Sequence, residues 1–137
     1  MTLPIHADVE AAFAEVRGRK ARFMIMKMTE EVNEILLENK GARDATFDDF
    51  KAAMPADEPR YAIYDLEYNT EDGRKESKLL FIMYSPDSCV GAKGRTLKFA
   101  YANNKETLKN KCNPTHRELQ VNDHEDIKEA SWVADCQ

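Results

Sequence analysis

The stretch Ser77-Lys-Leu-Leu-Phe-Ile-Met-Tyr-Ser-Pro86 contains six consecutive apolar side chains, from Leu79 to Tyr84. An apolar run of this length is typical of a strand that is buried on both faces in the middle of a sheet. Pro86 ends the strand, because proline has no backbone N–H to donate to a neighbour. The stretch therefore predicts an α/β protein whose helices cover both faces of a central sheet.

Other strand patterns surround this central run. Residues 60–69 are rich in aromatic and branched side chains, and the Glu71-Asp-Gly73 turn favours a hairpin with the central strand. We predict three further strands, over residues 21–28, 31–39 and 117–121. A short polar turn at Thr29 and Glu30 is expected to join the first two. The fold class is then a single α/β domain with a mixed sheet of about five strands.

Apolar residues at helical spacing predict the helices. We expect helices over residues 9–17, 47–54 and 96–112, with one short and one weaker helix within 123–137. Asp8 and Thr46 are suited to cap the first two helices, which end at Gly18 and Pro55. Pro114 sets the end of the third helix, because the residue before a proline avoids the helical conformation.

Length and composition indicate one ordinary globular domain. The chain has 137 residues, of which 42% are hydrophobic and 33% charged. We expect one domain over residues 1–137, with a flexible N-terminal extension at 1–7 and a short C-terminal segment at 128–137. The N-terminal sequence does not resemble a secretion signal, and no apolar run is long enough to span a membrane, so we expect a cytoplasmic protein. The odd number of cysteines favours reduced thiols.

Charge and aromatic pattern exclude a general nucleic-acid binder. The net charge is −5, whereas such proteins need a basic footprint against phosphate. Tyr61, Tyr64 and Tyr68 invite comparison with a base-stacking platform, but Tyr61 alternates with the other two, so packing is the better interpretation. Basic residues still gather in 17–22, 74–78 and 93–111, where they can attract an acidic partner.

The helix over residues 96–112 separates two stripes of side chains. Leu97, Tyr101, Asn104 and Leu108 follow each other at intervals of four, three and four, which predicts that Leu97, Tyr101 and Leu108 face the sheet. The stripe predicted to face outward consists of Lys98, Ala102, Lys105 and Lys109. A lysine stripe is most often a solvated face, but three like charges at these spacings repel each other. That cost favours a surface for an acidic partner.

Enzymatic interpretations are weaker. His6, His116 and His124 have no metal-ligand spacing, and Pro114 separates Cys112 from His116. The acidic residues 123–126 lack the glycine turn of a calcium loop, and residues 91–95 lack the lysine-hydroxyl end of a phosphate loop. We therefore expect no catalytic residue, metal or cofactor. A small enzyme that uses Cys112 and His116 stays open as an alternative.

Four segments together resemble a known family. They are Arg60-Tyr-Ala-Ile-Tyr-Asp-Leu-Glu-Tyr68, Asp72-Gly73, Lys78-Leu-Leu-Phe-Ile-Met-Tyr-Ser-Pro-Asp87 and Tyr101-Ala-Asn-Asn-Lys-Glu-Thr-Leu-Lys109. In this order and spacing they resemble the actin-depolymerising factor/cofilin family, over residues 5–127. The resemblance implies the ADF-homology fold, actin binding without catalysis, and a place in the cytoplasmic cytoskeleton.

The resemblance also implies a site for the actin monomer. In the family, the long helix enters a cleft of the monomer, helped by the N-terminal segment. The positions that match here are Leu3, Pro4, Ile5, Arg95, Lys98, Phe99, Lys105 and Lys109. Phe99 stands where the family usually has methionine, which keeps an apolar anchor but makes it bulkier and stiffer. The family prefers ADP-bound actin, and we expect the same of this chain.

A second implied site contacts the actin filament. Its matching positions are Arg74, Lys75 and Lys78. Glu76 falls where a basic residue is common, and Ala134 and Asp135 fall where the family has charged positions that end in arginine. An aspartate in place of arginine repels an acidic partner, so we expect binding to the monomer with weakened severing of filaments.

Further expectations concern regulation and partners. Family members are commonly inactivated by phosphorylation of an N-terminal serine, and here Thr2 is the nearby hydroxyl. The basic surface is expected to bind phosphoinositide headgroups in competition with actin, and the protein is expected to be a monomer. The alternative function with the same fold is regulation of branch junctions through actin-related proteins, as in glia maturation factor.

Overall fold

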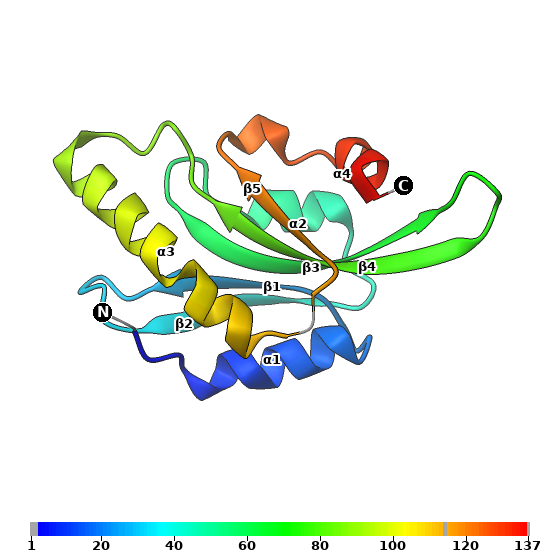
Figure 1. Ribbon diagram of the computed structural model, residues 1–137, viewed down its shortest axis with the longest axis horizontal. Helices are drawn as coiled ribbons and strands as arrows, with labels where there is room; N and C mark the ends of the chain where they lie inside the picture. The colour runs from blue at the N-terminus through cyan, green and yellow to red at the C-terminus, as the bar shows by residue number, and fades with distance from the viewer. Residues whose placement is uncertain (1–2, 114, 137) are drawn as a thin grey trace.

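The computed structural model describes residues 3–113 and 115–136, which are built around one five-stranded sheet. The strands are β1 (Ala21–Met28), β2 (Ile35–Ala42), β3 (Arg60–Asn69), β4 (Lys75–Tyr84) and β5 (Arg117–Val121). Their order in the sheet is β2-β1-β3-β4-β5. Only the β4–β5 pair is parallel, which makes the sheet mixed (Figure 1). The predicted fold class is confirmed.

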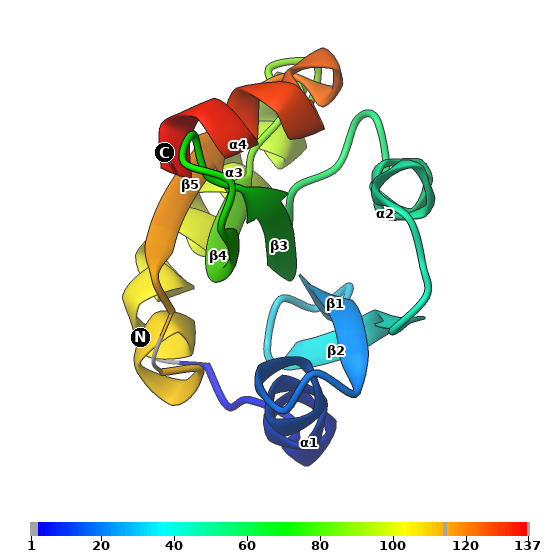
Figure 2. The ribbon, with the colours of Figure 1, turned by 90° about the vertical axis from the view of Figure 1, so that its right-hand side faces the viewer.

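Helices cover both faces of the sheet (Figures 1 and 2). The helices are α1 (Ala7–Arg17), α2 (Phe47–Ala53), α3 (Gly91–Lys111) and α4 (Glu129–Cys136), with a 3-10 turn at His124–Asp126. Side chains of α1 and α3 pack on one face, and side chains of α2 and α4 pack on the other. The parallel pairing of β5 follows from α3, because a helical crossover returns the chain in the same direction.

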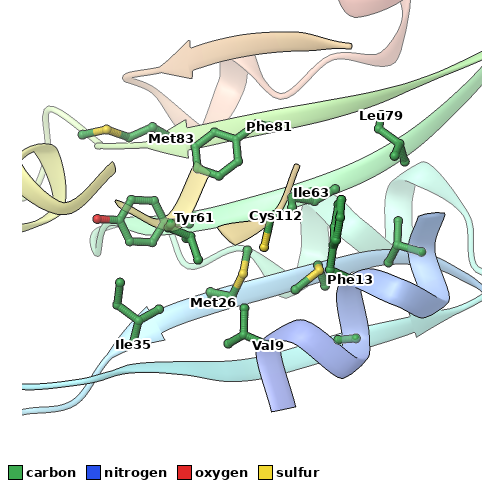
Figure 3. Packing of buried hydrophobic residues seen from close by; sticks show 14 of the residues in the cluster. Val9, Phe13, Met26, Ile35, Tyr61, Ile63, Leu79, Phe81, Met83 and Cys112 are labelled. Atoms are coloured by element: carbon green, nitrogen blue, oxygen red, sulfur yellow. The ribbon is translucent and has the colours of Figure 1, made fainter. Parts of the chain in front are cut away.

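Alternation along β3 divides the core into these two layers. Tyr61 and Ile63 contribute to the layer below α1 and α3, part of which Figure 3 shows. Tyr64, Leu66 and Tyr68 point to the opposite layer, below α2 and α4. Since the three tyrosines are buried and divided between two faces, they form no stacking platform.

The start of α1 differs from the prediction. Asp8 is not the cap: the helix begins at Ala7, and the Nδ1 atom of His6 accepts a hydrogen bond from the N–H of Asp8 at 3.1 Å. Histidine is an uncommon cap, so the sequence pattern favoured the aspartate. Gly18 ends the helix as predicted.

The start of β2 lies four residues later than predicted. The N–H of Thr29 binds the carbonyl oxygen of Glu34 at 3.0 Å, and Val32 adopts a positive φ of 55°. Residues 29–34 therefore form a longer turn than expected. The hairpin pairing of β1 with β2 is confirmed.

The long helix α3 begins five residues before the predicted start. Gly91 takes a φ of 89°, and the next turn contains Gly94, where a Cβ atom would lie 3.1 Å from the backbone of Cys89. Two glycines so close together are typical of a loop, which concealed the first turn. Here they let the preceding loop approach the helix closely.

The C-terminal segment contains the two helical elements that the sequence predicts, the 3-10 turn at His124–Asp126 and α4. Trp132 of α4 is buried, and its ring lies 5.2 Å from that of Phe47.

Cys89, Cys112 and Cys136 are buried free thiols. Across residues 3–113 and 115–136, no helix has the length and apolar character needed to cross a membrane.

Candidate functional site: the outward face of helix α3

The inward face of α3 is anchored to the sheet by Tyr101. Its hydroxyl accepts a hydrogen bond from the N–H of Met28 at 2.8 Å, and the hydroxyl of Tyr61 donates to its carbonyl oxygen. Leu108 is buried on the same face, as predicted, and Asn104 is buried beside it. Burial raises the pKa of Tyr101 above its usual value, so the phenol stays neutral. α3 is therefore a fixed platform.

The outward face of α3 carries an exposed aromatic ring. Phe99 is 69% exposed. Among the described residues, the only other exposed large apolar side chain is that of Val90, just before the helix. Lys98 is half-buried and Arg95 is exposed, and neither forms an ion pair with a described residue. An apolar ring flanked by free cations is typical of a docking surface.

The other two lysines of the predicted outward stripe do not stand free. Lys105 Nζ lies 2.6 Å from Glu118 Oε1, and Lys109 Nζ lies 2.8 Å from Glu118 Oε2. Hydrogen bonds from Lys105 and Lys109 lower the pKa of the Glu118 carboxyl, and Glu118 raises the pKa of Lys109. The expectation of three unrelieved lysine charges was wrong, because β5 supplies a carboxylate to two of them.

The N-terminal segment lies against α3. The Leu3 N–H donates to Asn104 Oδ1 at 3.1 Å, and the Leu3 side chain is buried in the core. Pro4 is exposed, while Ile5 is half-buried and forms a bridge with Ile35. Of this segment, Leu3 therefore contacts α3, whereas Ile5 is held by β2.

Two N-terminal predictions remain as predictions. Thr2, the expected phosphorylation site, lies outside the described residues. Flexibility of residues 1–7 also stays a prediction, although His6 donates its N–H to the Ile35 carbonyl oxygen at 2.9 Å. Sequence reasoning missed the role of Asn104, whose position among apolar neighbours was its only signal.

The predicted filament residues lie elsewhere, on the β3–β4 hairpin. Figure 1 shows this hairpin extending away from the body of the protein, opposite the start of α3. Arg74 pairs with Asp72 at 3.1 Å and Glu76 at 3.5 Å, whereas Lys75 and Lys78 form no ion pair with a described residue. The structure thus separates the two predicted sites.

The C-terminal helix approaches the turn end of this hairpin, because its contact residue Tyr68 lies two residues before the turn that starts at Thr70. The Tyr68 hydroxyl donates to the Cys136 carbonyl oxygen at 3.3 Å, and Ala134 and Asp135 are exposed on α4. The residues that depart from the family pattern therefore lie on an element that contacts the hairpin. Asp135 adds negative charge on the side where the family pattern leads us to expect arginine.

Comparison with known proteins decides the family. Residues 2–137 match the family model described as cofilin/tropomyosin-type actin-binding protein. The chain is 34% identical over 122 residues to actin-depolymerizing factor 2 of Petunia hybrida, covering 88% of this chain and 82% of that protein.

The chain belongs to the cofilin/ADF family.

Solved structures agree with this membership. Cofilin of Streptomyces griseoflavus superposes with a TM-score of 0.85 and is 29% identical, over 98% of this chain and 97% of that one. Glia maturation factor of Caenorhabditis elegans superposes with a TM-score of 0.74 over 98% of this chain and 95% of that one, but at 20% identity it shows likeness of fold alone. It gives no support to the alternative function.

In this cofilin/ADF chain, the Cys112 and His116 pair does not fit nucleophilic catalysis. Cys112 is fully buried, and burial raises the pKa of its thiol to about 12, which keeps the thiolate scarce at neutral pH. The Nδ1 atom of His116 is occupied by the Leu79 N–H at 2.8 Å. Within the described residues, no group of three potential ligands could hold a metal ion.

Proposed function

We propose that this chain binds actin monomers through the outward face of α3 and the adjoining Leu3–Ile5 segment, and regulates filament depolymerisation by that binding. The observation that carries the proposal is the 69% exposed ring of Phe99, held on a rigid helix beside Lys98 and Arg95. Burial of such a ring in a partner's cleft supplies affinity, and the two cations supply attraction to an acidic surface.

The individual residues take different roles in this proposal. Phe99, Lys98 and Arg95 contact actin directly, and exposed Pro4 lies alongside. Leu3 acts by position, because its side chain is buried and its N–H fixes the segment to α3. Ile5 has the same supporting role through its bridge to β2. Lys105 and Lys109 contribute from the flank of the helix.

The finer functional proposals concern filaments and regulation. Arg74, Lys75 and Lys78 form the filament site, and severing is weakened because Asp135 stands on α4, which contacts the hairpin near its turn. ADP-bound actin is the preferred monomer, phosphoinositide headgroups compete for the basic surface, and Thr2 is the regulatory hydroxyl. The protein acts as a cytoplasmic monomer, without catalysis or a cofactor.

A monomer-binding titration tests the proposal. We expect Lys98→Ala to weaken binding about 1.4- to fivefold, since an exposed ion pair typically contributes about 0.2–1 kcal/mol. Lys51→Ala, on α2 at the opposite face, removes the same charge and should leave binding unchanged. Single substitution of Lys98 is preferable to a double change with Lys105, because loss of Lys105 would leave Glu118 partly unpaired.

Two outcomes would contradict parts of the proposal. Wild-type protein that ignores actin monomers at low salt would contradict the function itself, and debranching through actin-related proteins would then favour the glia-maturation-factor alternative. In a seeded filament-disassembly assay we expect little severing. Robust severing at sub-stoichiometric protein would show that Asp135 does not weaken the filament site.

A further inference from the structure

Glu118 holds two lysines of the binding helix at once. It lies on β5, the edge strand beside α3 (Figure 2). Each of its carboxylate oxygens takes one ammonium group, Lys105 at 2.6 Å and Lys109 at 2.8 Å. The three side chains are 29%, 28% and 36% exposed, so the cluster is partly shielded yet open to an incoming partner.

The first lysine of the same stripe provides an internal comparison. Lys98 lies seven residues before Lys105, on nearly the same side of the helix, and forms no ion pair with a described residue. Glu118 therefore reduces the combined charge of Lys105 and Lys109 from two to one, while Lys98, beside Phe99, keeps its full charge.

We propose that Glu118 takes the place of the partner's carboxylates on Lys105 and Lys109 in the free protein, and thereby lowers the affinity of α3 for actin. The inference rests on the proposed function. An acidic groove that engages these lysines must compete with Glu118 for their ammonium groups, and the charge of Glu118 also repels that groove. The exchange favours a partner that presents two acceptors at the lysine spacing, which adds selectivity.

The substitution Glu118→Gln tests the inference. Glutamine keeps the size of the side chain and the β5 backbone pairing, but removes the negative charge. Exposed ion pairs change an equilibrium by a factor of about 1.5 to 5 each, so loss of both pairs with Glu118 should tighten actin-monomer binding about two- to 25-fold at low salt. The gain should shrink as salt rises, because exposed charges are screened.

Glu10→Gln is the matched control. Glu10 pairs with Lys111, also on α3, at 2.5 Å, and both side chains are about half exposed. The control therefore changes net charge equally and also frees a lysine of this helix, but Lys111 lies on the opposite flank. We expect it to tighten binding less than twofold. Equal effects of the two substitutions, or no gain from Glu118→Gln, would overturn the inference.

A second measurement needs no actin. Amine-reactive labelling read by mass spectrometry should show Lys105 and Lys109 protected in the wild type and more reactive in Glu118→Gln, with Lys98 unchanged. Equal reactivity in both proteins would overturn the inference.

Wild-type protein that fails to bind actin would instead contradict the proposed function, and this inference with it. Wild-type binding without a gain in Glu118→Gln would overturn this inference alone.

Discussion

Replacement of Phe99 by alanine should abolish most actin binding without loss of stability. An aromatic side chain offers about 150–250 Å² for burial, and at 69% exposure about 100–170 Å² of Phe99 remains for a partner. At about 25 cal/mol per Å², this area corresponds to roughly 2.5–4 kcal/mol. Because part of any buried area is offset by ordering costs, we expect a loss of about 2–4 kcal/mol, or about 30- to 900-fold in Kd.

Stability should change little or rise slightly in the same variant. The ring makes few contacts in the free protein, and alanine is a better helix former than phenylalanine by a few tenths of a kcal/mol. Thermal unfolding followed by circular dichroism should therefore give a Tm at or slightly above that of the wild type. Phe99→Met keeps an apolar anchor and should recover most of the lost affinity.

Two results would refute this reasoning. Phe99→Ala with wild-type affinity in a monomer titration would show that the ring does not dock. A Tm lower by many degrees would show that the ring is packed in the free protein. Either result would separate the exposed ring from the proposed function.

Three further predictions concern stability. Thr46→Ala removes the capping box of α2 and should cost about 0.5–2 kcal/mol in urea unfolding, whereas Thr46→Ser should be nearly neutral. Asp65→Ala should cost about 2 kcal/mol, because it removes a buried carboxylate 2.7 Å from Arg43, and a midpoint equal to the wild type would contradict that pairing. Burial raises the pKa of Tyr64 and Tyr84 to about 12, whereas a tyrosine in the unfolded chain has a pKa of about 10. Their contribution to stability is thus intact below about pH 10 and lost as the pH rises toward 12. Phenolate absorbance should therefore appear together with unfolding. Phenolate absorbance in the folded protein would contradict this burial.

The sheet could be predicted because its signals are local. The bounds of β3 and β5 agree with the prediction: the aromatic and branched run of β3 ends at the Glu71–Gly73 turn, and β5 follows the proline-containing segment after α3. The N-terminal turn of α3 was missed because Gly91 and Gly94 look like a loop, although here they serve a close approach to Cys89. At these positions the local sequence pattern favours a loop, whereas the folded protein requires glycine within the helix.

The candidate site was only half predictable for a different reason. Helical spacing separates the buried side of α3 from its exposed side, and it correctly placed Tyr101. Spacing gives no information on which residue of another element lies beside a lysine. The pairing of Lys105 and Lys109 with Glu118 depends on how β5 returns along α3, and the contact of Leu3 with Asn104 depends on the path of the N-terminal segment.

The anchoring of Tyr101 explains how one exposed ring can dominate binding. Its hydrogen bonds to Met28 and Tyr61 attach the middle of α3 to both β1 and β3, only two residues from Phe99. A ring on a helix fixed in this way loses little backbone entropy when it docks, so more of its burial appears as affinity. Lys98 adds the charge that Glu118 does not neutralise. The affinity of this surface should therefore follow the few groups that are free and preorganised, rather than the number of lysines on the helix.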